Sequence, residues 1–204
     1  MIYPKTCSLC GHTGLYLCLS CRQSLNHKGI HLPKNSRLEG HLSLFRYQGL
    51  IKSAISDLKF KFVSDIIDEI SDLVVYSLVN HYPHLLRYWQ ENNFVFVPIP
   101  LHHYRQLWRG YNQSELLATK ISQELNMTSN ENLITRLKNT PPQSLIKDRR
   151  LRHQSLNTTF SCATTAPPLN IILFDDVYTS GSTLNSAAST LPDSCHLWGL
   201  SLAG

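Results

Sequence analysis

The segment IILFDDVYTSGST, residues 171–183, constrains the fold of this chain more than any other. It begins with four apolar residues, Ile171 to Phe174, and continues with two adjacent aspartates. A continuous apolar run of this kind is typical of a central parallel strand covered on both faces. The segment therefore predicts an α/β fold in which Asp175 and Asp176 lie at the carboxyl end of a strand, where open α/β sheets bind their ligands.

The two acids and the turn that follows them have complementary chemistry. Burying adjacent carboxylates without partners is costly, whereas at an exposed strand end they can accept hydrogen bonds from the vicinal hydroxyls of a ribose. The next small residues let successive backbone amides surround a phosphate; they are Thr179, Ser180, Gly181, Ser182 and Thr183. The order predicts a ribose 5-phosphate site. A Walker loop is excluded because the chain lacks its GxxxxGK[ST] pattern.

Four of the six cysteines form two CxxC pairs near the start of the chain: Cys7, Cys10, Cys18 and Cys21. Two turns can each offer a thiolate pair to one tetrahedral Zn²⁺, and four such ligands close a structural site. A redox CxxC would not explain the second pair, and scattered cysteines would rarely produce this symmetry. We interpret Cys162 and Cys195 as packing residues.

Length and composition set the domain organisation. With 204 residues, 42% of them hydrophobic, the chain can form one sizeable core and a small appendage. We expect a zinc ribbon and linker over residues 1–40, where residues 26–40 are polar and interrupted by Gly and Pro, and an α/β domain over residues 41–204.

Hydrophobic spacing predicts the other main elements. Helices are expected over residues 50–58, from residue 65 to an interruption at Pro83, after an Asn112 cap, and over residues 183–191; strands are expected over residues 94–100 and 195–204. The first helix has an apolar stripe and leaves three polar side chains toward water: Lys52, Asp57 and Lys59.

Basic residues gather in two loops. Arg105 and Arg109 lie between the strand at 94–100 and the next helix, where open sheets hold anions, although solvated loop arginines are common. Residues 140–160 form either a basic flap or a solvated connection, with Arg149, Arg150 and Arg152 at its centre. The net charge of +5 suits a phosphate ligand or nucleic acid without deciding between them.

The chain is expected to be cytoplasmic, because no apolar run approaches the roughly 20 residues of a membrane span and the first residues lack the plan of a signal peptide. Thiols stay reduced in that compartment, which favours a metal over disulfides for the CxxC pairs.

Residues 171–183 resemble the phosphoribosyl pyrophosphate (PRPP) fingerprint of type I phosphoribosyltransferases, with Tyr178 in place of the usual aliphatic residue. Together with the CxxC pairs, residues 45–61 and the segment RGYNQSELLA (109–118), the chain is similar to the ComF family over nearly its whole length. Gln143, Arg152 and Phe160 match a later block of that family, and Ser155 stands where asparagine is usual.

This resemblance implies a phosphoribosyltransferase-like parallel sheet flanked by helices, with PRPP and Mg²⁺ as ligands. Asp175 and Asp176 would bind the ribose hydroxyls, Thr179 to Thr183 the 5-phosphate, and the loop from Pro98 through Arg105 to Arg109 the pyrophosphate. Asp175, Asp176 and Arg109 are thereby the catalytic candidates.

The resemblance also implies a role in natural competence, since family members are implicated in handling or importing single-stranded DNA or in using DNA as a nutrient. Two hypotheses remain open: a PRPP-dependent transferase with an unidentified acceptor, or a non-catalytic, PRPP-gated adaptor that binds single-stranded DNA alongside other DNA-uptake proteins. In the second, Arg149, Arg150 and Arg152 would contact the phosphates, and three aromatic residues could stack on bases or serve only in packing: Tyr104, Trp108 and Tyr111.

Overall fold

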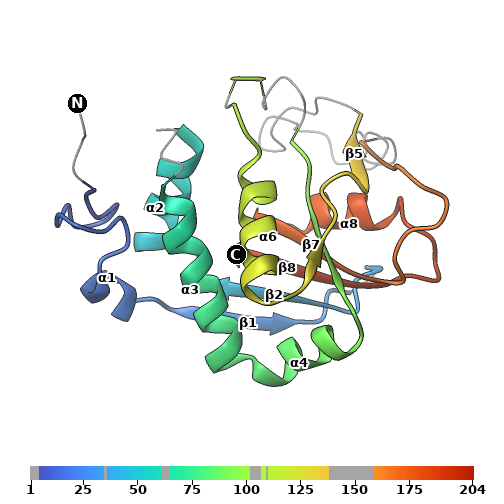
Figure 1. Ribbon diagram of the computed structural model, residues 1–204, viewed down its shortest axis with the longest axis horizontal. Helices are drawn as coiled ribbons and strands as arrows, with labels where there is room; N and C mark the ends of the chain where they lie inside the picture. The colour runs from blue at the N-terminus through green and yellow to red at the C-terminus, as the bar shows by residue number, and fades with distance from the viewer. Residues whose placement is uncertain (1–4, 35, 61–64, 102–106, 109, 138–158) are drawn as a thin grey trace.

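The computed structural model describes residues 5–34, 36–60, 65–101, 107–108, 110–137 and 159–204. Their centre is a six-stranded sheet of order β1-β2-β8-β7-β3-β4 (Figure 1). The strands are β1 (His27–His31), β2 (Gly40–Phe45), β3 (Val95–Pro98), β4 (Thr128–Ser129), β7 (Asn170–Val177) and β8 (His196–Ala203). All neighbouring strands are parallel except β1, which is antiparallel to β2. The predicted α/β class with a mainly parallel sheet is confirmed.

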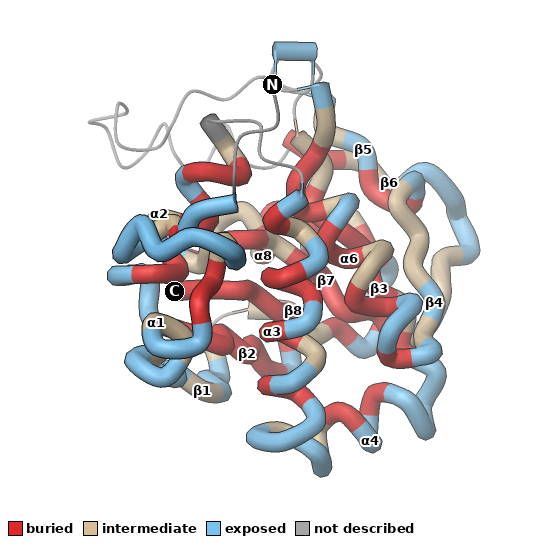
Figure 2. The backbone as a smooth tube through the Cα atoms, turned by 60° about the vertical axis from the view of Figure 1, so that its left-hand side comes forward, coloured by how far each residue is buried: buried red, intermediate tan, exposed pale blue. Residues whose placement is uncertain are grey.

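Helices cover both faces of this sheet. Five helices pack on it: α2 (Gly49–Phe60), α3 (Ile66–His81), α4 (Pro83–Glu91), α6 (Gln113–Glu124) and α8 (Ser182–Ala188). Ile172 and Phe174 point into a core cluster shared with the first four helices, whereas Ile171 and Leu173 point into a second cluster with α8. This alternation explains why β7 is apolar at every position from Ile171 to Phe174. Figure 2 shows the buried strands enclosed by more exposed segments.

The predicted helices at 50–58 and from residue 65 are confirmed as α2 and α3. Pro83 lies beyond the end of α3, as predicted, but it also begins α4, which was not predicted. Proline is tolerated in a first helical turn because no partner is needed there for its missing N–H. The Asn112 cap is confirmed, since its side chain accepts a hydrogen bond from Ser114 N at 3.2 Å. The helix expected over residues 183–191 is shorter and ends at Ala188.

The polar stretch 26–40, expected to be a linker, contains β1. Its register pairs His27 with Phe45 and His31 with His41, so this strand forms one edge of the main sheet. A separate two-stranded sheet joins β5 (Ile134–Arg136) to β6 (Phe160–Cys162). None of the described helices combines the length and the apolar character needed to cross a bilayer.

Candidate functional site

The doubled aspartate lies at the carboxyl end of β7, in the middle of the sheet. Asp175 and Asp176 belong to the strand itself, which ends at Val177. Alongside, β3 ends at Pro98, which pairs with Phe174, and Ile99 N donates to the Phe174 carbonyl at 2.8 Å. The residues expected to bind ribose and the first residue of the expected pyrophosphate loop thus meet at one edge of the sheet.

The two carboxylates have different environments. Asp176 is 4% exposed and its Oδ2 forms an ion pair with the Lys59 ammonium group of α2. Asp175 is only partly buried, and its Oδ1 accepts from Ser114 Oγ at 3.3 Å and from Asp176 N at 2.9 Å. Burial, followed by the charge of Asp176, raises the pKa of Asp175 to about 8, against the opposing effect of Lys59.

The expectation that Lys59 and Asp57 face water is wrong, whereas Lys52 is exposed as expected. Asp57 is buried, and the Lys59 side chain is 19% exposed. Lys59 follows the buried Ile55 by four residues, so both lie on the same helical face. That spacing was the signal that could have identified Lys59 as an inward-facing residue. Ser114, which lies two residues after the Asn112 cap and contacts Asp175, was also missed.

The turn after β7 is shaped around Gly181. Its φ is +74°, and a Cβ built at this position would lie 2.5 Å from the Tyr178 hydroxyl oxygen. Only glycine therefore fits without strain. Thr179 and Ser180 are exposed, and Ser180 Oγ lies 3.0 Å from Ser182 Oγ, so hydroxyl groups gather on this turn immediately before α8.

The Tyr178 side chain packs between this turn and the histidines of β1 and β2. Its ring stacks on His41 with centroids 3.8 Å apart and meets His31 at 5.4 Å. His41 is buried in β2, where burial, and then the charges of His31 and Lys28, lower its pKa to about 3. The imidazole is therefore neutral near pH 7 and serves as a packing surface for Tyr178.

Several predicted residues lie outside the described residues: Tyr104, Arg105, Arg109, Gln143, Arg149, Arg150, Arg152 and Ser155. Of the aromatic candidates that are described, Trp108 is 63% exposed. Tyr111 is instead partly buried, and its hydroxyl donates to the Leu58 carbonyl at 2.6 Å. Asn112 Nδ2 donates to the Ile99 carbonyl at 3.2 Å, which ties the start of α6 to the end of β3.

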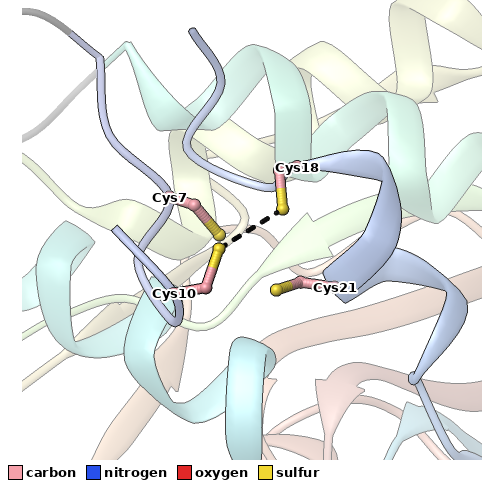
Figure 3. A group of neighbouring side chains, drawn as sticks. All are labelled: Cys7, Cys10, Cys18 and Cys21. Carbon is pink, nitrogen blue, oxygen red and sulfur yellow. Dashed lines mark hydrogen bonds between the residues drawn. The ribbon is translucent and has the colours of Figure 1, made fainter. Parts of the chain in front are cut away.

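The four predicted metal ligands converge, as Figure 3 shows. Their sulfur atoms all lie within 4.8 Å of one another, with Cys18 immediately before α1 (Leu19–Gln23) and Cys21 inside it. Cys10 Sγ and Cys18 Sγ are 3.6 Å apart, near the about 3.8 Å between sulfurs of a tetrahedral zinc site with bonds of about 2.3 Å. A hydrogen bond from Ser20, with a backbone hydrogen bond from Cys21, lowers the pKa of Cys18 to about 6, whereas the contact with Cys18 and burial raise the pKa of Cys21 to about 12. A metal bound by all four thiolates would therefore displace protons.

The cysteine-rich segment is attached to α3 through Glu69. Glu69 Oε1 accepts from Tyr16 N at 3.1 Å and Oε2 from Leu17 N at 2.8 Å. Leu17, Cys7 and Cys18 belong to the same core cluster as α3. Of the remaining cysteines, Cys195 lies in the second cluster, and Cys162 packs against it, as expected for packing residues.

Comparison with known proteins gives three informative similarities. The chain is 39% identical over 116 residues to Competence protein F of Haemophilus influenzae, covering 52% of this chain and 49% of that protein. It is 34% identical over 154 residues to Competence protein ComFC of Bacillus subtilis, covering 76% and 58% respectively. Identity to the DNA utilization protein YhgH of Escherichia coli strain K12 is 28% over 194 residues, covering 92% and 82%. The chain thus spans less than two thirds of the length of the first two relatives. No protein-family model matches it.

Proposed function

The chain belongs to the ComF family, and on that premise we propose that it binds PRPP with Mg²⁺ at the carboxyl ends of β3 and β7 and acts in DNA uptake. The observation that carries this proposal is the position of the doubled aspartate and the TSGST turn, directly after one another at the end of a central parallel strand. This is the place where α/β sheets bind nucleotide-like ligands.

Asp175 and Asp176 form the ribose end of the proposed site. Asp175 is partly buried at the sheet edge, and α6 reaches its carboxylate through Ser114. Mg²⁺ in proteins is held by one or two carboxylates together with substrate phosphates. Asp175 would hold the metal in its deprotonated form, and the ion would supply positive charge beside the pyrophosphate.

Thr179 to Thr183 form the phosphate end. The left-handed conformation of Gly181 and the exposed hydroxyls of Thr179 and Ser180 suit a turn whose amides surround an anion. Only a few residues of chain separate this turn from Asp175. This short separation matches the short distance between the 5-phosphate and the ribose hydroxyls within one ligand.

The chemistry proposed for this site is phosphoribosyl transfer. Departure of pyrophosphate from the anomeric carbon leaves an oxocarbenium-like centre, so the site needs cations on the leaving group and carboxylates near the sugar. Arg105 and Arg109 would neutralise charge on the leaving pyrophosphate. Asp175 and Asp176 would stabilise the positive charge that develops on the sugar. Mg²⁺ supplies further charge neutralisation on the pyrophosphate when bound.

A non-catalytic function is the second candidate. The relatives' names refer to competence and DNA utilization. In this alternative the chain would be a PRPP-gated adaptor in the cytoplasm that binds single-stranded DNA through Arg149, Arg150 and Arg152 and contacts other uptake proteins.

We assign Zn²⁺ to the four converging cysteines. A set of four sulfur ligands with tetrahedral spacing is typical of zinc, and it leaves no position for a substrate. The metal would therefore stabilise the amino-terminal segment and take no part in the chemistry.

Calorimetric titration of PRPP with Mg²⁺ tests the proposal. Wild type should bind, the Asp175→Ala/Asp176→Ala variant should not, and the exposed Asp193→Ala should bind as wild type. Pyrophosphate release with any member of a nucleobase panel would then identify a transferase. PRPP binding without release, combined with salt-dependent binding of single-stranded DNA, would identify the adaptor. Failure of folded, metal-loaded wild type to bind PRPP would contradict both.

A further inference from the structure

Two glycines lie at opposite ends of a short column of residues that runs from the main sheet to the turn after β7. A Cβ built at Gly199, in β8, would lie 2.6 Å from His41 Cδ2. A Cβ built at Gly181, in the turn, would lie 2.5 Å from the Tyr178 hydroxyl oxygen. Between the glycines the two rings stack, with centroids 3.8 Å apart and planes inclined by 23°. Gly199, His41, Tyr178 and Gly181 thus form one continuous column of contacts, which we call the ring column.

The sheet fixes the lower members of the ring column. His41 pairs with Gly199 in the parallel register of β2 and β8, and it is only 1% exposed. Tyr178 N donates to the Ala203 carbonyl at 2.7 Å, so the backbone of Tyr178 continues the pairing of β7 with β8. Side chains packed in a protein interior cannot shift without losing contacts. The rings therefore limit how closely the turn at Gly181 can approach the sheet.

The Tyr178 ring meets the turn through its carbon edge as well as through its hydroxyl. A Cβ at Gly181 would also lie 2.8 Å from Tyr178 Cζ and 2.9 Å from Cε2. Among the described residues, none forms a hydrogen bond with the Tyr178 hydroxyl. The size of the ring, more than its polar group, thus determines the contact. A smaller side chain would leave a void beneath the turn, into which neighbouring atoms can relax.

We infer that Tyr178 is a positioning residue for the phosphate end of the proposed site: stacked on His41, it holds the TSGST turn at the distance from the sheet where the turn can bind the 5-phosphate. This inference rests on the proposed function and deepens it. Phosphate and ribose belong to one ligand, so the turn must stand at a fixed distance from Asp175 and Asp176. A displacement of about 1 Å at a binding group can cost a large factor.

The test compares dissociation constants for wild type and four variants, measured with Mg²⁺ on the full chain loaded with zinc. The variants are Tyr178→Val, Tyr178→Leu, Tyr178→Phe and Tyr82→Val. Tyr82 is the matched control, because it is also a partly buried tyrosine but packs against the other core cluster. The two probes are PRPP and pyrophosphate, which has no 5-phosphate. Circular dichroism and thermal unfolding establish the folded fraction of each variant.

Tyr178→Val should weaken PRPP binding about tenfold or more, because the turn loses the ring beneath it. Valine is an aliphatic residue of the kind usual at this place in the fingerprint, so this variant asks whether the turn of this chain depends on the ring. Tyr178→Leu should weaken binding less, and Tyr178→Phe should bind PRPP within about threefold of wild type, since it keeps the ring. Tyr82→Val should lower the melting temperature and bind PRPP as wild type does. Pyrophosphate affinity should stay within about threefold of wild type in every variant.

Several results would overturn the inference. If Tyr178→Phe loses as much affinity as Tyr178→Val, the hydroxyl itself contacts the ligand. If folded Tyr178→Val binds PRPP at wild-type strength, the ring does not position the turn; Tyr178→Leu gives the same answer where Tyr178→Val does not fold. Equal losses for PRPP and pyrophosphate would show that the effect is not confined to the phosphate end. Failure of wild type to bind PRPP would refute the proposed function as well, and that result is visible before any substitution is made.

Discussion

Replacing Glu69 by alanine should loosen the attachment of the cysteine-rich segment to α3. Glu69 is 7% exposed, and its two oxygens accept the backbone N–H groups of Tyr16 and Leu17. Arg22 Nη2 lies 3.5 Å from Oε2, and Arg22 Nε donates to the Leu17 carbonyl at 2.7 Å. Alanine would remove both acceptors at once, and the segment offers no adjacent carboxylate to replace them among the described residues.

The loss of stability in Glu69→Ala can be worked out from the two backbone N–H groups that would lose their acceptor. The Leu17 N–H is buried and the Tyr16 N–H partly buried, and a buried donor left without a partner costs about 1–3 kcal/mol. The Arg22 side chain is partly exposed and can turn to water, so the loss of its ion pair with Glu69 adds little to this cost. The free energy of unfolding should fall by about 3 kcal/mol. For a chain of this length the melting temperature should fall by about 6–12 °C.

Thermal unfolding of the zinc-loaded protein, followed by circular dichroism, measures this change. Glu69→Gln keeps one acceptor oxygen, so its melting temperature should lie between those of wild type and Glu69→Ala. Asp72→Ala alters an exposed acid of the same helix and serves as the control. If Glu69→Ala melts at the temperature of Asp72→Ala, the carboxylate does not attach the segment and the reasoning is refuted.

Three further results are expected. Cys18→Ser should abolish stoichiometric metal binding and lower the melting temperature, as native mass spectrometry and thermal unfolding would reveal, because a tetrahedral site loses one of its four ligands. Gly181→Ala should lower the free energy of unfolding in urea by about 1–3 kcal/mol, because alanine is strained at φ +74° and its Cβ would meet the Tyr178 hydroxyl. His41 has a lowered pKa, so the unfolded chain takes up its proton first as pH falls; stability should decrease from pH 6.5 toward 3 by about 1.4 kcal/mol per pH unit. His41→Phe should lack that contribution when unfolding is compared across this range.

Much of the fold could be predicted because its signals are local. The apolar run before Asp175 predicted a central parallel strand, and the structure has β7 between β3 and β8. The CxxC spacing predicted four converging sulfurs, which the structure brings together. Strand β1 was missed because its residues are almost all exposed or polar; His27 to His31 owe their strand conformation to backbone pairing with β2, which no pattern within the strand records.

The different environments of the two aspartates could not be predicted from their own segment. The alternation of a strand puts Asp175 and Asp176 on opposite faces, but nothing in IILFDDVYTSGST indicates which of the two acids meets a cation. The difference comes from α2, whose register brings Lys59 onto the face that also carries the buried Ile55. A lysine at the end of an apolar stripe is normally placed in water, because its long side chain can reach out from a buried stem. Here the buried carboxylate at the strand end supplies a partner, so the same flexible side chain is held inward. The pairing of a helix-end lysine with a fingerprint acid is therefore a property of the assembled sheet and helices, and the direction of Lys59 can be assigned only once β7 and α2 are placed side by side.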